Sequence, residues 1–149
     1  MRRVVTFAVL VPMTVLMIVA CGDDEETLTT DEFVEQADAI CAAGTTELDD
    51  AFAELYGPSG EEPTPEQQTA FVEDTVAPLI QGQIDSGEAL NPPEDLQDEV
   101  EQWLADVQTV LDGITDDPES IFGPEAEDLF AEVDAQASEI GLTACAGED

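Results

Sequence analysis

Apolar residues recur every three or four positions along most of the chain, which is the spacing of one face of an α-helix. The first such stripe runs from Phe33 to Leu55. Thr29 and Glu32 stand before it at the spacing of a capping box, and Gly57 follows it with a proline behind. The pattern therefore predicts a first helix that begins just after Thr29 and ends before Gly57.

A second stripe follows a short loop and runs from Phe71 towards Leu90. Its start carries Thr64 as the expected N-cap, with a proline at the first helical position and Gln67 at the third. Pro78 lies inside the stripe and removes one backbone donor, so we expect a kink or a break there. Such a bend would shape either a ligand pocket or, more simply, the wrapping of the helix around a small core.

Two further stripes complete the pattern. The third covers Leu96 to Ile114 after a proline pair. The fourth begins either at Asp117-Pro118 or after Gly123-Pro124, with a short turn between these points in the second case, and it ends in a Schellman motif at Gly141. Four helices joined by short links predict an all-α domain, an antiparallel four-helix bundle whose second helix is kinked at Pro78. Its single tryptophan, Trp103, fits the centre of the core better than a ligand platform.

The first residues of the chain have the three parts of an export signal. Arg2 and Arg3 form a positive start, and residues 4–19 are apolar and uncharged. The string Ile18-Val19-Ala20-Cys21 that follows resembles the lipobox of bacterial lipoproteins, with Ile18 where that family usually has Leu. The resemblance implies cleavage before Cys21 and attachment of lipid to its sulfur.

We accordingly expect a lipoprotein signal peptide in residues 1–20, a lipidated cysteine with an acidic tether in 21–28, and the helical domain in 29–149. The alternative is an uncleaved membrane helix. Residues 4–19 are at the short end of a span, Pro12 would disturb its middle, and the flank after Cys21 is acidic. We therefore expect export and anchoring to the outer face of the bacterial cell membrane through Cys21.

Charge narrows the classes of partner. The chain has 37 Asp and Glu residues, no His, and two basic residues, which are Arg2 and Arg3 of the signal. The remaining chain would repel nucleic acids and anionic lipid headgroups, so neither is expected as a partner. A bias this uniform indicates adaptation to a saline, halophilic habitat rather than a local site, with a cation-binding surface or a basic partner as the alternative. The pattern identifies neither an envelope protein partner nor an oligomeric state.

The expected export of the protein predicts the redox state of its cysteines. If lipid occupies Cys21, then Cys41 and Cys145 are left in an oxidising environment, where two thiols usually form a disulfide. Cys41 lies on the apolar stripe of the first helix and would face the core. A metal or redox role is the alternative, but no His or second thiol lies beside either residue.

The residue types exclude most catalytic chemistry. Without His, Lys or a free thiol there is no Ser–His triad, no Cys–His pair, no His/Cys zinc site and no Schiff base. No glycine-rich phosphate loop is present, so we expect no cofactor and no enzyme. Acidic clusters could hold a divalent cation such as Ca²⁺, although none matches an EF-hand. The weak candidates are Asp112, Asp116, Asp117 and Glu119.

Several short motifs together resemble a group of small exported helical proteins of actinobacteria. They are Phe33-x-x-x-Ala37-Asp38-Ala39-Ile40-Cys41, the pair Pro92-Pro93, the following Trp103, and Gly141-Leu142-x-x-Cys145. The resemblance implies a helical fold and the disulfide, and it implies no activity. The sequence differs from the group in lacking basic residues. We expect a noncatalytic envelope lipoprotein that acts by interaction or as a surface component, with binding of a divalent cation or a small ligand as the alternative.

Overall fold

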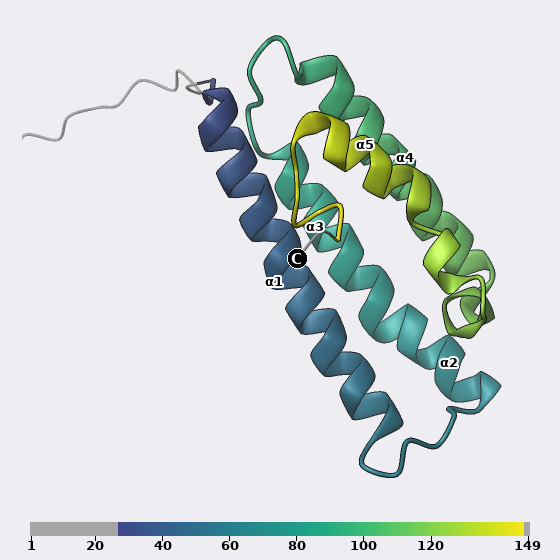
Figure 1. The fold of residues 1–149 in the computed structure, drawn as a ribbon. Helices are drawn as coiled ribbons and strands as arrows, with labels where there is room; N and C mark the ends of the chain where they lie inside the picture. Colours follow the sequence, from purple (N-terminus) through teal and green to yellow (C-terminus); the bar gives the residue numbers. More distant parts are fainter. Residues whose placement is uncertain (1–26, 148–149) are drawn as a thin grey trace, which may run out of the picture.

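The computed structural model describes residues 27–147, and every regular element in that part of the chain is helical (Figure 1). The elements are α1 (Thr30–Tyr56), α2 (Pro65–Phe71), a π-helical segment (Val72–Val76), α3 (Ala77–Glu88), α4 (Gln97–Asp116), two 3-10 turns (Pro118–Phe122 and Ala126–Asp128) and α5 (Ala131–Ile140). Among these helices, none combines the length and the apolar character that a membrane span needs. The expected lipidation site Cys21 and the signal peptide lie outside the described residues.

The start of α1 confirms the predicted capping box. The Thr29 hydroxyl accepts a hydrogen bond from the Glu32 amide at 3.4 Å, and the Glu32 carboxylate accepts one from the Thr29 amide at 3.1 Å. These bonds satisfy two backbone donors. The Thr29 hydroxyl also donates to the Glu32 carboxylate at 2.7 Å, and this bond, with the one from the Thr29 amide, holds the pKa of Glu32 below its usual value. The helix ends at Gly57, whose φ of 57° favours a residue without a side chain.

The second predicted helix also begins at its predicted cap, where Thr64 and Gln67 make the same reciprocal bonds. It does not break at Pro78, because residues 65–88 are helical throughout. The π-helical segment lies directly before the proline, and the Ala77 amide donates to the Val72 carbonyl, one residue further back than in an α-helix. The wider turn lies where the proline ring would otherwise crowd the preceding turn.

The last helix starts later than either predicted point. α5 begins at Ala131, and the two 3-10 turns occupy most of the chain between it and α4. The short turn expected at Ile121 and Phe122 is present in the first of them. Phe122 packs against Phe52 of α1, with ring centroids 5.9 Å apart, and this aromatic contact holds the link where a helix was expected.

The end of α5 is the predicted Schellman motif. Gly141 is left-handed with φ 96°, and the Leu142 amide donates to the Ala137 carbonyl at 2.8 Å. Leu142 is fully buried, so the chain reverses into the core immediately after the helix. Residues 142–147 then return towards α1 (Figure 1).

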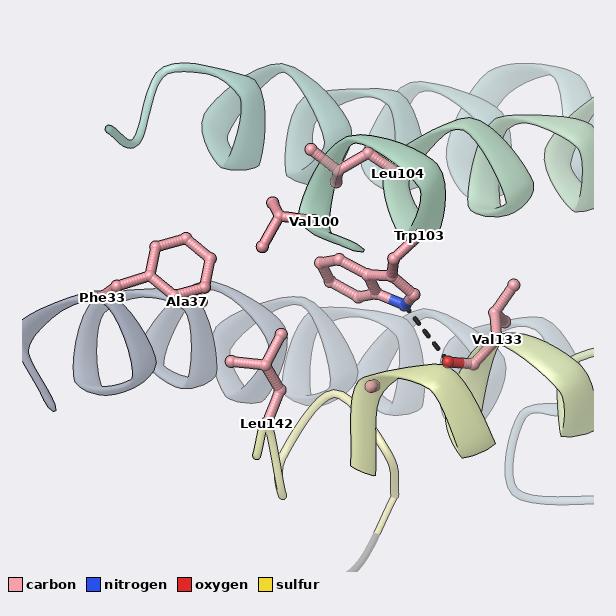
Figure 2. Close-up of a cluster of buried hydrophobic side chains, with 8 residues drawn as sticks. Phe33, Ala37, Val100, Trp103, Leu104, Val133 and Leu142 are labelled. Carbon is pink, nitrogen blue, oxygen red and sulfur yellow. Dashed lines mark hydrogen bonds between the residues drawn. The ribbon is translucent and has the colours of Figure 1, made fainter. Parts of the chain in front are cut away.

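Most of the buried apolar side chains belong to two clusters. The Phe33 cluster contains Phe33, Ala37, Val100, Trp103, Leu104, Val133, Ala137 and Leu142. The Phe71 cluster contains Phe71, Val76, Ile80, Ile84 and Leu111. Figure 2 shows the Trp103 ring inside the first cluster, where its Nε1 donates to the Val133 carbonyl at 3.1 Å. Trp103 is therefore a core residue, as predicted.

Carboxylates in this fold are hydrogen-bonded by neutral groups, because residues 27–147 contain no Lys, Arg or His. On helix surfaces, glutamine amides donate to aspartates four residues later, at 2.9 Å for Gln81 to Asp85 and 2.9 Å for Gln102 to Asp106. Gln102 and Gln136 together lower the pKa of Asp106. Amide donors thus take the position that lysine takes in most helical proteins.

The predicted disulfide joins Cys41 of α1 to Cys145 of the tail, with Cα atoms 5.0 Å apart. Asp38, one turn earlier in α1, reinforces this attachment. Its carboxylate accepts hydrogen bonds from the Ala144 amide at 3.0 Å and from the amide and hydroxyl of Thr143 at 3.3 Å and 3.2 Å. The tail is therefore attached to α1 by one covalent bond and three hydrogen bonds.

Replacing both Cys41 and Cys145 by serine should lower the free energy of unfolding by about 2–5 kcal/mol, because the bond closes most of the domain into one loop. Urea unfolding followed by circular dichroism measures the change, and a Cys21→Ser variant is the control. Equal stability of the double variant, together with two titratable thiols in the oxidised parent, would contradict the disulfide.

Candidate functional site

The acidic residues considered for a cation do not form a site. Asp112 is exposed and accepts a hydrogen bond from Gln108 at 3.0 Å, while Asp116 and Asp117 lie at the end of α4 and Glu119 lies in the next turn. Across residues 27–147, no group of three or more Asp, Glu, Cys or His side chains is arranged to hold a metal ion. These four residues therefore provide no assembled metal centre.

The feature that does suggest binding is a cavity of about 310 Å³ lined by members of both hydrophobic clusters. Its walls come from α1, α3, α4, α5 and the tail after α5. Most of the lining is apolar, including Ile40, Leu48, Leu79, Ile84, Val107 and Phe130. Side chains that would fill a continuous core here leave a space instead, so the two clusters are joined only along its walls.

Two glycines determine how closely α3 approaches its neighbours at the cavity wall. Gly44 is a buried position of α1, and a Cβ atom built there would lie 1.1 Å from the Gln83 amide nitrogen. The missing side chain of Gly44 thus admits the Gln83 amide of α3 to the cavity wall. Gly87 is one turn further along α3, where a Cβ would meet Leu104 of α4 at 3.0 Å. Glycine thus lets α3 approach both α1 and α4 beside the cavity.

Three side chains bring polar atoms to the cavity: Thr45, Gln83 and Asp134. Thr45 is exposed, so its hydroxyl marks the solvent side, whereas Gln83 and Asp134 are half-buried. An amide offers both donors and an acceptor, and an ionised carboxylate offers only acceptors. The cavity is therefore an apolar space with a few convergent polar groups, the usual composition of a small-molecule site.

Asp134 is the titratable residue of this wall, and burial raises the pKa of its carboxyl. The folded state then holds the proton more tightly than the unfolded chain does. Ionisation of Asp134 consequently opposes folding. This cost in folding free energy grows as the pH rises from the ordinary pKa of aspartate to the raised pKa of Asp134, and it stays constant at higher pH. A positively charged group beside the carboxylate would remove this cost.

Sequence reasoning identified parts of these walls but not the cavity. Trp103 and Cys41 were expected in the core, and both also line the cavity. The pocket considered at Pro78 does not include that residue, although Leu79 and Ile80, which follow it, contribute to the lining. The available signal was Gly44, a residue without a side chain on a stripe of large apolar ones. Asp134 carried no signal, since acidic residues occur throughout the chain.

Comparisons of this chain with protein-family models, with curated proteins and with solved structures found no match.

The cavity can be tested by filling it. Val107 lines it and packs against both clusters, so Val107→Phe should place a ring in available space and leave the free energy of unfolding within about 1 kcal/mol of the parent. Val76 is 2% exposed and does not line the cavity, so Val76→Phe should overpack the core and cost about 1–3 kcal/mol.

Urea unfolding of the two variants and the parent measures the difference. Equal destabilisation by the two phenylalanines would mean that the space beside Val107 is closed in solution.

Proposed function

We propose that this chain is a noncatalytic lipoprotein of the bacterial cell envelope whose helical domain binds a small apolar ligand. The observation that carries the binding part is the cavity between α1, α3, α4 and α5. Its volume of about 310 Å³ is within the range of small-molecule sites, which begins near 300 Å³. The absence of an assembled cation cluster among residues 27–147 favours this reading over divalent-cation binding.

The physical driving force is burial of apolar surface. A water molecule in the cavity needs two to four polar partners, and most of the wall offers none. An apolar ligand would replace such water and contact Leu48, Ile84 and Val107, with a gain of about 25 cal/mol for each Å² of apolar surface removed from water. Gln83 and Asp134 would orient a polar group of the ligand.

The noncatalytic part of the proposal rests on side-chain chemistry. The chain has no His or Lys, and Cys41 and Cys145 are bonded to each other. The cavity wall therefore lacks a nucleophile paired with a base, which acyl transfer and related reactions need. A lone carboxylate can bind and orient a ligand without transforming it.

We further propose that the four helical units form an up-down-up-down antiparallel bundle that bends near Pro78. Contacts of α1 with α3, α3 with α4, and α4 with α5 support this arrangement. The Leu28 amide also donates to the Asn91 carbonyl at 2.9 Å, which brings the start of α1 beside the link between α3 and α4. A π-helical segment followed by proline combines two known causes of helix bending.

The proposed envelope location rests on the resemblance of residues 18–21 to a lipobox. It also rests on the apolar segment before them, which is preceded by the positive charges of Arg2 and Arg3. Two acyl chains on one cysteine provide durable anchoring, at about 0.8 kcal/mol for each buried CH₂. Asp23 to Glu26 would then form an acidic spacer between the membrane and α1. The cavity would lie within reach of compounds that pass along the outer membrane surface.

Binding is tested with Trp103, which is the only tryptophan of the chain and lines the cavity. Adamantane-1-methanol, a compact neutral apolar alcohol, should change Trp103 fluorescence saturably in the parent protein. Val107→Phe should abolish the saturable change by occupying the same space. A linear, unsaturable response, equal in parent and variant, would contradict ligand binding.

Anchoring is tested by expressing the full chain in a bacterium that lipidates its lipoproteins. The mature protein should begin at Cys21, carry acyl chains by mass spectrometry and sediment with membranes. Cys21→Ser should lose the acyl chains and retain residues 1–20. Parent protein that keeps residues 1–20 and carries no lipid would show that the segment is an uncleaved anchor.

A further inference from the structure

We infer that the ligand of this cavity is an apolar organic cation, a compact hydrocarbon that carries an ammonium group paired with the Asp134 carboxylate. This inference rests on the proposed function and specifies its ligand. It is carried by the place of Asp134 in a mainly apolar wall and by the lack of any Lys, Arg or His in residues 27–147.

The position of Asp134 is determined by the core. Val133 is buried, and its carbonyl accepts the hydrogen bond from Trp103 Nε1 that Figure 2 draws between α4 and α5. This bond, 3.1 Å long, fixes the backbone of α5 one residue before Asp134. Asp134 is therefore placed on the wall that it shares with Trp103 and Phe130.

No group of the fold neutralises this carboxylate. The lining contains no other titratable side chain, apart from cysteines that are joined in the disulfide. Residues 27–147 contain no Lys, Arg or His at all. Partial burial of an uncompensated carboxylate is unfavourable, and the raised pKa of Asp134 reflects that cost. A cation supplied by a ligand would provide the missing countercharge.

The rest of the chain selects for the same sign of charge. With 37 Asp and Glu residues, the protein attracts cations to its surface and repels fatty acids, phosphate esters and other anionic amphiphiles. Trp103 and Phe130 add aromatic rings to the wall, and aromatic faces attract ammonium groups at short range. The negative charge of the protein and the aromatic rings of the wall thus both favour an apolar organic cation.

A metal ion does not fit the same wall. Ca²⁺ takes six to eight oxygen ligands and Mg²⁺ takes six in an octahedron. The cavity offers the side-chain oxygens of Asp134, Gln83 and Thr45 on three different helices, among mainly apolar neighbours. An ammonium group carries three N–H donors, which three side-chain acceptors can satisfy, and its hydrocarbon body gains from the apolar remainder.

The experiment compares three ligands of one shape with different charges: adamantane-1-methylamine, adamantane-1-methanol and adamantane-1-carboxylate. At pH 7 the first is a cation, the second is neutral and the third is an anion. The full chain is reconstituted in phosphatidylcholine vesicles, and dissociation constants are measured from Trp103 fluorescence. For each protein, the compared quantity is the dissociation constant of the alcohol divided by that of the amine. Both constants are measured on the same protein, so differences in folding yield between variants do not affect this ratio.

In the parent protein, the amine should bind about 10- to 100-fold more tightly than the alcohol, and the carboxylate should not bind. Asp134→Asn should reduce the preference for the amine to within about threefold of unity while leaving alcohol binding in place. Glu132→Gln removes the same charge from an exposed position of α5, outside the cavity lining, and should keep the preference. In 1 M NaCl, where the Debye length is about 3 Å, most of the preference should persist because the pair is in contact.

Equal binding of amine and alcohol by the parent would overturn the cation assignment and leave the apolar-ligand proposal standing. A preference for the amine that survives Asp134→Asn, or that disappears equally in Glu132→Gln, would also overturn the cation assignment. The source of the preference would then be the overall negative charge of the protein rather than Asp134. If none of the three compounds binds, both the cation assignment and the proposed function fail.

Discussion

The whole structure depends on the fact that its carboxylates have no basic partners. Residues 27–147 contain no Lys, Arg or His, so no side-chain ion pair can form there and like charges repel in every direction. Cohesion must come from apolar burial, neutral hydrogen bonds and one covalent link. The two hydrophobic clusters supply the apolar burial, and glutamine and threonine side chains supply many of the neutral hydrogen bonds. The Cys41–Cys145 disulfide is the covalent link.

This constraint explains why the tail after α5 matters. Leu142 closes the Phe33 cluster, and Asp38 binds the following backbone amides, so an acidic side chain is used as a hydrogen-bond acceptor for the main chain. The disulfide then fixes the same segment to α1 and makes Cys145 part of the cavity wall. One short segment therefore completes both the core and the candidate site. The same constraint makes Asp134 unusual, because partial burial raises the pKa of its carboxyl and no basic side chain in residues 27–147 compensates for it.

Most of the local structure could be predicted from sequence because its causes are local. Thr29 and Thr64 cap helices through hydrogen bonds to residues three positions later, and Gly141 ends α5 through its own backbone angles. The start of α5 could not be predicted in this way. Phe122 packs against Phe52 of α1, and this distant contact holds the link in 3-10 turns where Pro118 or Pro124 could have begun a helix.

The sequence by itself predicted the all-helical class, the helix caps at Thr29, Thr64 and Gly141, and the pairing of Cys41 with Cys145. It also showed directly that residues 27–147 contain no Lys, Arg or His. Only the tertiary structure decided that α1, α3, α4 and α5 leave a cavity, and that Asp134 rather than any other acid lines it. Periodicity assigns a residue to a face of its own helix, but the distance between helices depends on how side chains from several elements fill the space between them. Gln83 of α3 lies where a Gly44 side chain would be, and only the tertiary structure brings these two residues together.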